Sequence, residues 1–167
     1  MTNDLQADIE KREDNLRNIK SVKLLDIEDL TLEPTITLYN WWSSFSPQIP
    51  TREQFDISQV PSIAANIYLI ERFNPGHYDY RLCGDLVGDL IGRHYREHPI
   101  MLNSPAFEDQ ILAEYLDMIS TDKTAYKCTG DLSFVDRQYI QFESVDCPLV
   151  NSKGEITHFV GALGQKS

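Results

Sequence analysis

The sequence predicts an α+β fold: an antiparallel sheet of five strands, with helices inserted between the second and third strands and further helices before the first. Three observations lead to this fold class. Two alternating apolar runs meet at a short glycine-containing turn near residue 154. A second pair of β-rich runs lies in the middle of the chain, and an amphipathic helical segment separates the two sets. Because strands and helices come in separate runs, the sheet is expected to be antiparallel.

The N-terminal segment, residues 1–22, is crowded with charge. Its apolar residues recur at loose helical spacing: Leu5, Ile9, Leu16 and Ile19. Such a thin stripe cannot be buried by one domain, so it indicates either a solvated helix or a helical contact between two copies. We expect the second, and with it a homodimer. The predicted organisation is a charged helical extension over residues 1–33 and a sheet domain over residues 34–167.

The next predicted element is a helix over residues 34–44. Pro34 suits its first position, where a missing N–H costs nothing. Leu38, Trp41 and Trp42 give this helix a heavy apolar face. We expect it to cover one face of the sheet, with Trp42 largely buried there.

Two strands are predicted in the centre of the chain, over residues 63–73 and 78–83, because both runs are β-rich and a turn containing proline and glycine separates them. Strand alternation would place Tyr80 and Leu82 on one face of the second strand and Arg81 on the other. Together the two runs form a hairpin.

Short helical pieces are expected over residues 84–100, where glycine and proline interrupt the pattern. A long helix then begins at Ser104-Pro105, a capping hydroxyl followed by proline, and continues to Ile119. The segment 126–134 alternates cleanly and is predicted as a strand. The closing hairpin joins residues 139–149 to residues 156–163.

Short motifs occur in a fixed order along the chain: Trp41-Trp42, Pro50-Thr51-Arg52, Phe55-Asp56, Val60-Pro61, Ile67-Tyr68-Leu69-Ile70, Tyr80-Arg81-Leu82-Cys83-Gly84, Gly92 and the hairpin Pro148–Gly161. Over residues 35–164 this order resembles PAS sensor domains. In particular, it resembles a compact, stand-alone bacterial PAS subfamily with a Tyr-Trp pair on a leading helix, in which Trp41 replaces the tyrosine. Asp85, Glu97 and Ile57 depart from the residues usual in that subfamily.

The resemblance implies a non-catalytic sensory or protein-interaction module that binds a small ligand in its core and signals through dimerisation. With no effector domain in this sequence, a separate signalling protein is the expected further partner. We expect the interior to be lined by the following pocket candidates: Tyr80, Leu82, Leu90, Ile91, Phe107, Ile111, Tyr115, Cys128, Leu132, Phe142 and Val160. The same residues would equally form a filled core.

Arg81 is the polar candidate. It would form an ion pair with Glu71 or Asp85, stack on an indole ring, or bind an anion. No catalytic or metal site is predicted, since His94 and His98 are the only histidines at helical spacing and Pro99 follows them.

The cofactor is unknown. In the PAS domains that this chain resembles, a haem ligand usually comes from the long central helix, which here has no histidine, and flavin-type light sensors carry an Asn-Cys-Arg-Phe step that is missing.

The alternative function is a small enzyme on a ketosteroid-isomerase-like cone-shaped α+β fold, which needs a buried carboxylate base. Asp131 is excluded because it lies on the polar side of its strand, which leaves Asp146 as a weak candidate for the base.

Composition limits the kinds of partner and the cellular location that we expect for this protein. The chain has 167 residues and a net charge of −11 at pH 7, so repulsion from phosphate argues against nucleic acid and anionic membranes. The spacing of Cys83, Cys128 and Cys147 suits buried reduced thiols rather than disulfides or zinc. With a charged N-terminal segment and no apolar run long enough to cross a bilayer, a cytoplasmic location is expected.

Overall fold

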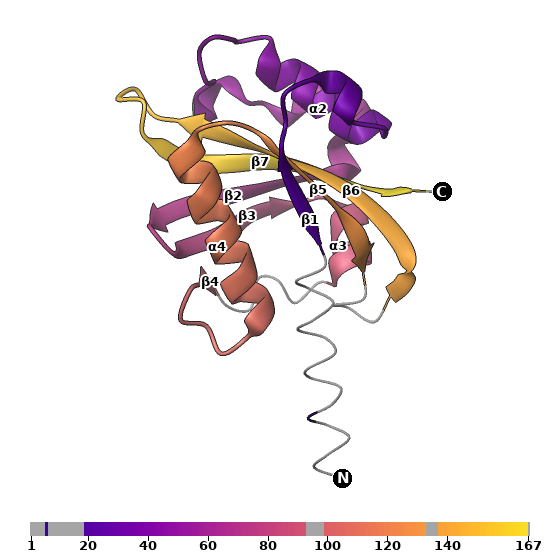
Figure 1. The fold of residues 1–167 in the computed structure, drawn as a ribbon. Coiled ribbons are helices and arrows are strands. Elements are labelled where there is room, and N and C mark those ends of the chain that lie inside the picture. Colours follow the sequence, from indigo (N-terminus) through magenta and orange to yellow (C-terminus); the bar gives the residue numbers. More distant parts are fainter. Residues whose placement is uncertain (1–5, 7–18, 93–98, 133–136, 167) are drawn as a thin grey trace.

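The computed structural model describes residues 6, 19–92, 99–132 and 137–166 (Figure 1). These residues form a seven-stranded sheet with the order β1-β5-β6-β7-β2-β3-β4, in which all neighbouring strands are antiparallel. The strands are β1 Lys20–Lys23, β2 Ile67–Asn74, β3 His77–Cys83, β4 Ile100–Met101, β5 Tyr126–Leu132, β6 Arg137–Val150 and β7 Ile156–Lys166. The α-helices are α2 Glu33–Ser43, α3 Asp85–Ile91 and α4 Phe107–Asp122, and short 3-10 turns lie at Ile27–Asp29, Arg52–Gln54, Ile57–Gln59 and Pro61–Asn66.

The five predicted strands form the centre of this sheet, in the order β5-β6-β7-β2-β3, with α3 and α4 inserted between β3 and β5. The fold class is therefore confirmed, and β1 and β4 extend the sheet at its two edges. The closing hairpin is also as predicted, with Gly154 at a φ of +77°, a conformation in which a Cβ would be strained. The helices α2 and α4 are confirmed, although α4 begins at Phe107, after the Ser104 hydroxyl accepts the N–H of Ala106.

The predicted N-terminal helix is wrong for residues 20–22. They belong to β1, which pairs with β5 through Lys20 opposite Thr129 and Lys23 opposite Tyr126. Pairing there satisfies backbone groups that the edge of β5 would otherwise expose, which outweighs a weak helical pattern. The segments 1–5 and 7–18 of that predicted helix lie outside the described residues.

The first predicted central strand begins later than expected. Residues 61–66 form a 3-10 turn that opens with Pro61, and β2 starts only at Ile67. Because proline fixes φ near the helical value, the chain turns before it can join the sheet. Asn66 then holds this turn to β7 by donating its side-chain amide to the carbonyl of Leu163 at 2.9 Å.

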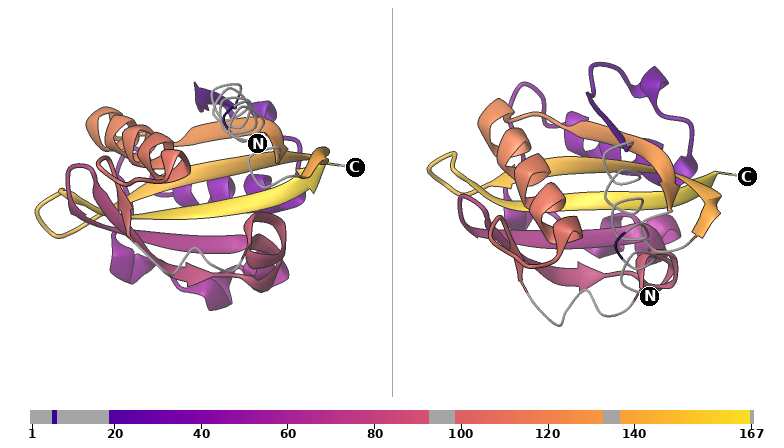
Figure 2. Two further views of the ribbon diagram at one scale, coloured as in Figure 1. Left: turned by 90° about the horizontal axis from the view of Figure 1, so that it is seen from below. Right: turned by 60° about the horizontal axis from the view of Figure 1, so that its bottom comes forward.

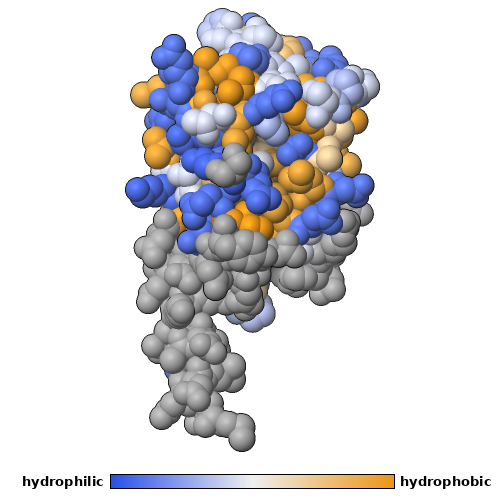
Figure 3. Space-filling model, turned by 90° about the vertical axis from the view of Figure 1, so that its right-hand side faces the viewer, coloured by the Kyte–Doolittle hydropathy of each residue, from blue (hydrophilic) through white to orange (hydrophobic). Residues whose placement is uncertain are grey.

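Helices cover both faces of the sheet, and each face has its own buried cluster (Figures 1 and 2). The α4 face is defined by Tyr68, Ile70, Tyr78, Leu116 and Phe159 among other buried residues. The α2 face is defined by Leu38, Ile67, Leu69, Val145 and Val160 among others. On the side of the molecule seen in Figure 3, small groups of hydrophobic residues lie between hydrophilic ones.

Strand β6 alternates strictly between these two faces. Phe142 and Val150 lie in the α4-face cluster, whereas Val145, Cys147 and Leu149 lie in the α2-face cluster. Because both faces of the sheet are covered, every residue of β6 from Phe142 to Val150 is buried. Buried and exposed positions therefore do not alternate along this part of the strand.

Glu143 anchors α2 to the sheet from the α2 face of β6. Its buried carboxylate accepts hydrogen bonds from the Thr31 N–H at 3.0 Å, the Thr31 hydroxyl at 2.8 Å, the Leu32 N–H at 3.2 Å and the Thr35 hydroxyl at 2.5 Å. Burial raises the pKa of Glu143, but these hydrogen bonds outweigh burial, and its pKa is lowered. The carboxylate thus satisfies N–H groups that the start of the helix would leave without partners.

Trp42 packs against the sheet as predicted, although it is only partly buried, whereas Thr35 and Leu38 are the residues of α2 that are fully enclosed. Trp42 lies at the edge of the α2-face cluster and donates its indole N–H to the carbonyl of Pro148 at 2.9 Å. An indole combines an apolar ring with a polar N–H, so a position at the rim of a cluster suits it.

Candidate functional site

The candidate site is a buried carboxylate in the middle of the sheet. Asp146 lies on β6 with 3% of its surface exposed. In the register of the sheet it stands opposite Tyr126 on β5 and Gly161 on β7. Strand alternation directs its side chain to the α4 face, into an otherwise apolar cluster.

Two tyrosine hydroxyls donate hydrogen bonds to this carboxylate. Tyr68 on β2 donates to Oδ1 of Asp146 at 2.5 Å, and Tyr115 on α4 donates to Oδ2 at 2.7 Å. Three separate elements, β2, β6 and α4, therefore converge on one carboxyl group. Hydrogen bonds to a charged acceptor are stronger than those between neutral groups, which is why such a group can remain inside.

Gly161 makes the bond from Tyr68 geometrically feasible. On the sheet, Tyr68 pairs with Gly161 and Gly161 pairs with Asp146, so the tyrosine ring must cross β7 to reach β6. A Cβ at position 161 would lie 2.1 Å from Cζ of Tyr68 and 2.4 Å from its hydroxyl oxygen. The ring thus occupies the space that a side chain at this position would need, as expected for a glycine inside a strand beside a close approach.

The environment perturbs every titratable group in the site. Burial raises the pKa of Asp146 to about 6, although the hydrogen bonds from Tyr68 and Tyr115 act in the opposite direction. Burial, followed by the charge of Asp146, raises the pKa values of Tyr68 and Tyr115 well above their usual range. Both phenols consequently keep their protons and remain donors.

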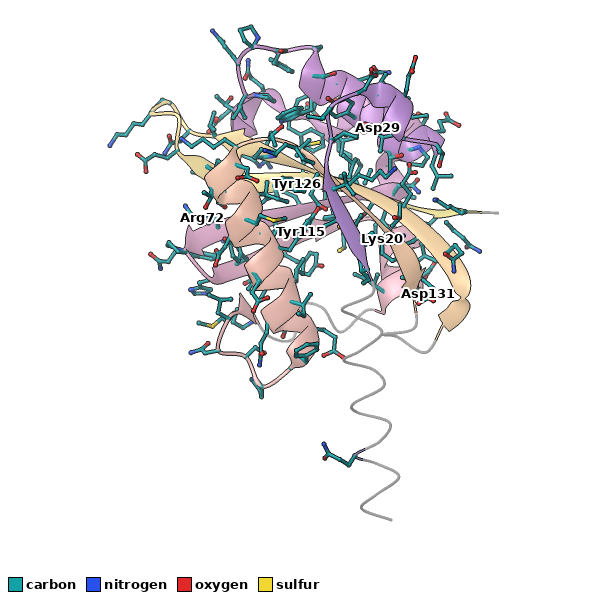
Figure 4. All side chains as sticks on the ribbon, viewed as in Figure 1. Lys20, Asp29, Arg72, Tyr115, Tyr126 and Asp131 are labelled. Atoms are coloured by element: carbon teal, nitrogen blue, oxygen red, sulfur yellow. The ribbon has the colours of Figure 1, made fainter. Side chains whose placement is uncertain are left out.

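Further aromatic rings pack against the two tyrosines that bond to the carboxylate. Tyr80 packs edge-to-face against Tyr68 with 6.4 Å between ring centroids. Tyr126 packs in the same way against Tyr115, with 6.3 Å between ring centroids (Figure 4). We call Asp146, Tyr68, Tyr80, Tyr115 and Tyr126 the carboxylate–tyrosine cluster. Cys128 lies beside it, and burial together with the charge of Asp146 raises the pKa of its thiol to about 12.

Within the part of the chain that the structure describes, no Lys, Arg or His side chain pairs with Asp146. The ion pairs there join Lys23 to Asp122 and Arg81 to Glu71. A buried carboxylate with two neutral donors and no cation is costly to maintain, because removing a charge from water costs several kcal/mol. This cost marks the cluster as a candidate functional site.

Most of the predicted interior residues lie on the same face as this cluster. Six of the pocket candidates belong to or pack against the α4-face cluster: Tyr80, Leu90, Tyr115, Cys128, Leu132 and Phe142. Ile91 packs there as well, whereas Phe107 and Ile111 are half-buried on α4 and belong to neither buried cluster of the described residues.

Leu82 and Val160 do not join them, because they lie on the α2 face. For Leu82 the reason is a β-bulge. Leu69 pairs with Leu82 but the next residue, Ile70, pairs with Tyr80, so Arg81 is an extra residue in β3. The extra residue places Tyr80 and Leu82 on opposite faces, where unbroken alternation had predicted the same face.

Arg81 itself forms an ion pair with Glu71, as one of the sequence interpretations had it, and its guanidinium lies 5.5 Å from the ring centre of Phe73. Half of its side chain is exposed, at 50%. His94 and His98 lie outside the described residues, and within these residues no group of three or more His, Cys, Asp or Glu side chains could hold a metal. Nor does any helix of the described segments have both the length and the apolar character to span a bilayer.

Sequence reasoning named Tyr80, Tyr115 and Cys128, but it missed the role of Tyr68 and mentioned Asp146 only for the alternative function. Two signals were available. Asp146 is an acidic residue between Val145 and the apolar run Cys147–Val150, and Gly161 is a glycine in the interior of a predicted strand. Both patterns indicate a special local environment.

Comparison with known proteins agrees with this architecture. A family model described as a PAS domain matches residues 30–164, and the chain belongs to the PAS domain family. PAS domains are generally sensory or interaction modules, and membership in the family suggests such a role for this chain.

Two solved structures are similar to the chain. One is an RNA-binding light-oxygen-voltage receptor, with 13% identity, a TM-score of 0.47, and coverage of 89% of this chain and 38% of the other. The second is the PAS domain of BvgS from Bordetella pertussis, with 16% identity, a TM-score of 0.43, and coverage of 66% of this chain and 82% of the other. This chain thus spans well under half of the first structure. No curated protein matches the chain.

Proposed function

We propose that this chain is a non-catalytic sensory module that holds a small ligand on the α4 face of its sheet, at the carboxylate–tyrosine cluster. The observation that supports the proposal is the buried, hydrogen-bonded carboxylate of Asp146. A domain that needed only a packed core would be at least as stable with an apolar residue at this position. Retaining an acidic group there, where its pKa is raised to about 6, is typical of a functional site.

The surroundings of the cluster support ligand access. Several residues that pack against the α4-face cluster remain partly exposed: Tyr80, Cys83, Leu86, Ile91, Leu112 and Tyr115. They come from β3, α3 and α4, so the apolar interior reaches the surface between these elements. The cluster itself contributes Tyr80 and Tyr115 to this boundary.

Native mass spectrometry of the freshly purified chain tests the proposal. We expect a co-purified small molecule, and we expect its occupancy to fall in Asp146→Leu, which removes the polar group but keeps the side chain large. The matched control is Glu155→Gln in the exposed closing turn, which changes the charge without touching the sheet interior. A ligand that remains equally bound in Asp146→Leu, or none in the parent, would contradict the proposal.

We also propose that the module works as a homodimer. Two exposed aliphatic side chains lie three residues apart at this edge of the sheet: Val22 on β1 is 54% exposed, and Leu25, just after the strand, is 81% exposed. A second copy would cover them. Light scattering over a concentration series should show a dimer in the parent and a shift toward monomer in Val22→Glu/Leu25→Glu. A parent that stays monomeric, or a variant that dimerises equally well, would contradict this part.

The small-enzyme alternative keeps one supporting observation: Asp146 is a buried carboxyl with a pKa raised to about 6, as an acid–base catalyst requires. However, Tyr68 and Tyr115 both donate to Asp146 itself rather than to a position where a substrate oxygen would develop charge. The strand order is also that of the expected sensor fold. This function is tested by incubating a panel of ketones with the protein in D2O and following by NMR the exchange of protons next to the carbonyl for deuterium. Exchange that Asp146→Asn abolishes would support the enzyme.

A further inference from the structure

The hydrogen-bonding capacity left in the carboxylate–tyrosine cluster is that of an acceptor. A carboxylate offers about four lone-pair positions, whereas a phenol has a single proton to donate. Tyr68 and Tyr115 both direct that proton to Asp146. The capacity that remains at the carboxylate is therefore for accepting further hydrogen bonds, and the complementary ligand is one that donates them.

The charge of the cluster points in the same direction. Asp146 has no cationic partner among the residues that the structure describes, so its negative charge is balanced only by the two phenol dipoles. The whole chain adds to this field with a net charge of −11. A surplus of negative charge attracts cations and repels anions, and the effect is larger where burial lowers the dielectric constant.

The aromatic rings add a third, independent preference. Tyr68 and Tyr80 form one edge-to-face pair and Tyr115 and Tyr126 form another, so each of the two tyrosines that bond to the carboxylate belongs to an aromatic pair. The face of an aromatic ring has negative electrostatic potential and attracts a cation, and such rings are the usual enclosure for organic ammonium groups.

From these three observations we infer that the ligand is a small organic cation, whose ammonium or amidinium group binds Asp146 within the tyrosine rings of the carboxylate–tyrosine cluster. This inference rests on the proposed function and specifies its ligand class. A neutral alcohol could donate one hydrogen bond to the carboxylate but would leave its charge unbalanced. An anion would be repelled by the carboxylate and by the ring faces together.

Three probes that differ only in their polar group test the inference on the full chain: phenethylamine, 2-phenylethanol and phenylacetate. Amide chemical shifts followed by NMR at neutral pH report both the affinity and the location of each probe. We expect phenethylamine to shift residues of β6, β2 and α4 and to bind at least about tenfold more tightly than 2-phenylethanol, which corresponds to about 1.4 kcal/mol. Phenylacetate should bind most weakly.

Variants separate the cluster from general attraction to an acidic protein. Asp146→Asn should remove the preference for phenethylamine, whereas Glu155→Gln, which removes one exposed negative charge, should keep it. Asp146→Leu provides a second variant if Asp146→Asn does not fold. It also removes the charge but keeps the side chain large, so the preference for phenethylamine should be lost there as well.

The outcomes distinguish the inference from the proposed function. If phenethylamine and 2-phenylethanol bind the α4 face equally, or if phenylacetate binds more tightly, the inference that the ligand is a cation is wrong. The proposed function, ligand binding at the cluster, is not affected by that result. A preference for phenethylamine that survives Asp146→Asn or Asp146→Leu also overturns the inference. If none of the probes shifts the α4 face, the cationic class is rejected, and the co-purification experiment separately decides the proposed function.

Discussion

The substitution Gly161→Ala tests how the site is built. The new Cβ would lie 2.1 Å from Cζ, 2.3 Å from Cε2 and 2.4 Å from the hydroxyl oxygen of Tyr68. Carbon atoms that are not bonded separate to about 3.5 Å or more, so the ring must move by more than about 1 Å. Its hydroxyl bond to Asp146, now 2.5 Å long, cannot survive that movement.

The expected loss of stability follows from three contributions. Losing a hydrogen bond to a charged, buried acceptor costs about 1.5–3 kcal/mol, and overpacking costs about 1–3 kcal/mol. Replacing glycine by alanine within a strand returns about 0.5–1 kcal/mol through the unfolded chain. The free energy of unfolding should therefore fall by about 2–5 kcal/mol in Gly161→Ala.

Chemical denaturation of four proteins measures this effect: the parent, Gly161→Ala, Tyr68→Ala and the double variant. In the Tyr68→Ala background the Cβ no longer meets a ring, so adding Gly161→Ala should cost close to nothing. Gly164→Ala on the same strand is the control, since its Cβ would meet only the flexible end of Leu32 at 2.9 Å. An unchanged midpoint for Gly161→Ala, or the same loss in both backgrounds, would refute the reasoning.

Three further predictions concern stability. Because burial raises the pKa of Asp146 from 3.8 to about 6, the native state binds more protons than the unfolded state between these pH values, and this carboxyl lowers stability as pH rises. Denaturation at several pH values should thus show Asp146→Asn gaining about 3 kcal/mol relative to the parent from about pH 4 to about pH 7, whereas a constant difference would contradict the raised pKa. Glu143→Ala should cost about 2–4 kcal/mol at neutral pH, since it removes the acceptor for the Thr31 and Leu32 N–H groups and for the buried Thr35 hydroxyl, and Glu143→Gln should cost less; equal midpoints for the two variants would argue against the anchor. Because the pKa of Glu143 is lowered, its contribution is present at neutral pH and lost as pH falls through that pKa. Trp42→Ala should cost about 2 kcal/mol, and Trp42→Phe, which keeps one aromatic ring but loses the hydrogen bond to Pro148, about 1 kcal/mol. If Trp42→Phe cost as much as Trp42→Ala, the packing of the remaining ring would contribute nothing.

Sequence periodicity predicted the strands and helices at the centre of the fold because each has a clear pattern. The strands β3, β5, β6 and β7 and the helices α2 and α4 all lie close to their predicted positions. Errors arose where tertiary pairing decides the conformation. Residues 20–22 form a strand only because β5 offers a free edge, and no local pattern in the sequence records that edge.

The candidate site was harder to predict for a related reason. A single extra residue at Arg81 reverses the face of Leu82, and strand alternation contains no warning of such a bulge. Asp146 could be recognised as unusual, but its partners Tyr68 and Tyr115 come from distant parts of the chain. Their convergence depends on the register of β2, β7 and β6 and on the docking of α4, which only the folded structure defines.

The central claim is that a ligand occupies the sheet interior beside Asp146. A high-resolution crystal structure of the protein as purified, without added ligand, tests it most directly. We predict electron density for a small molecule on the α4 face, within hydrogen-bonding distance of the Asp146 carboxylate and next to the rings of Tyr68 and Tyr115. A carboxylate enclosed only by protein side chains, with no density beside it, would contradict the account.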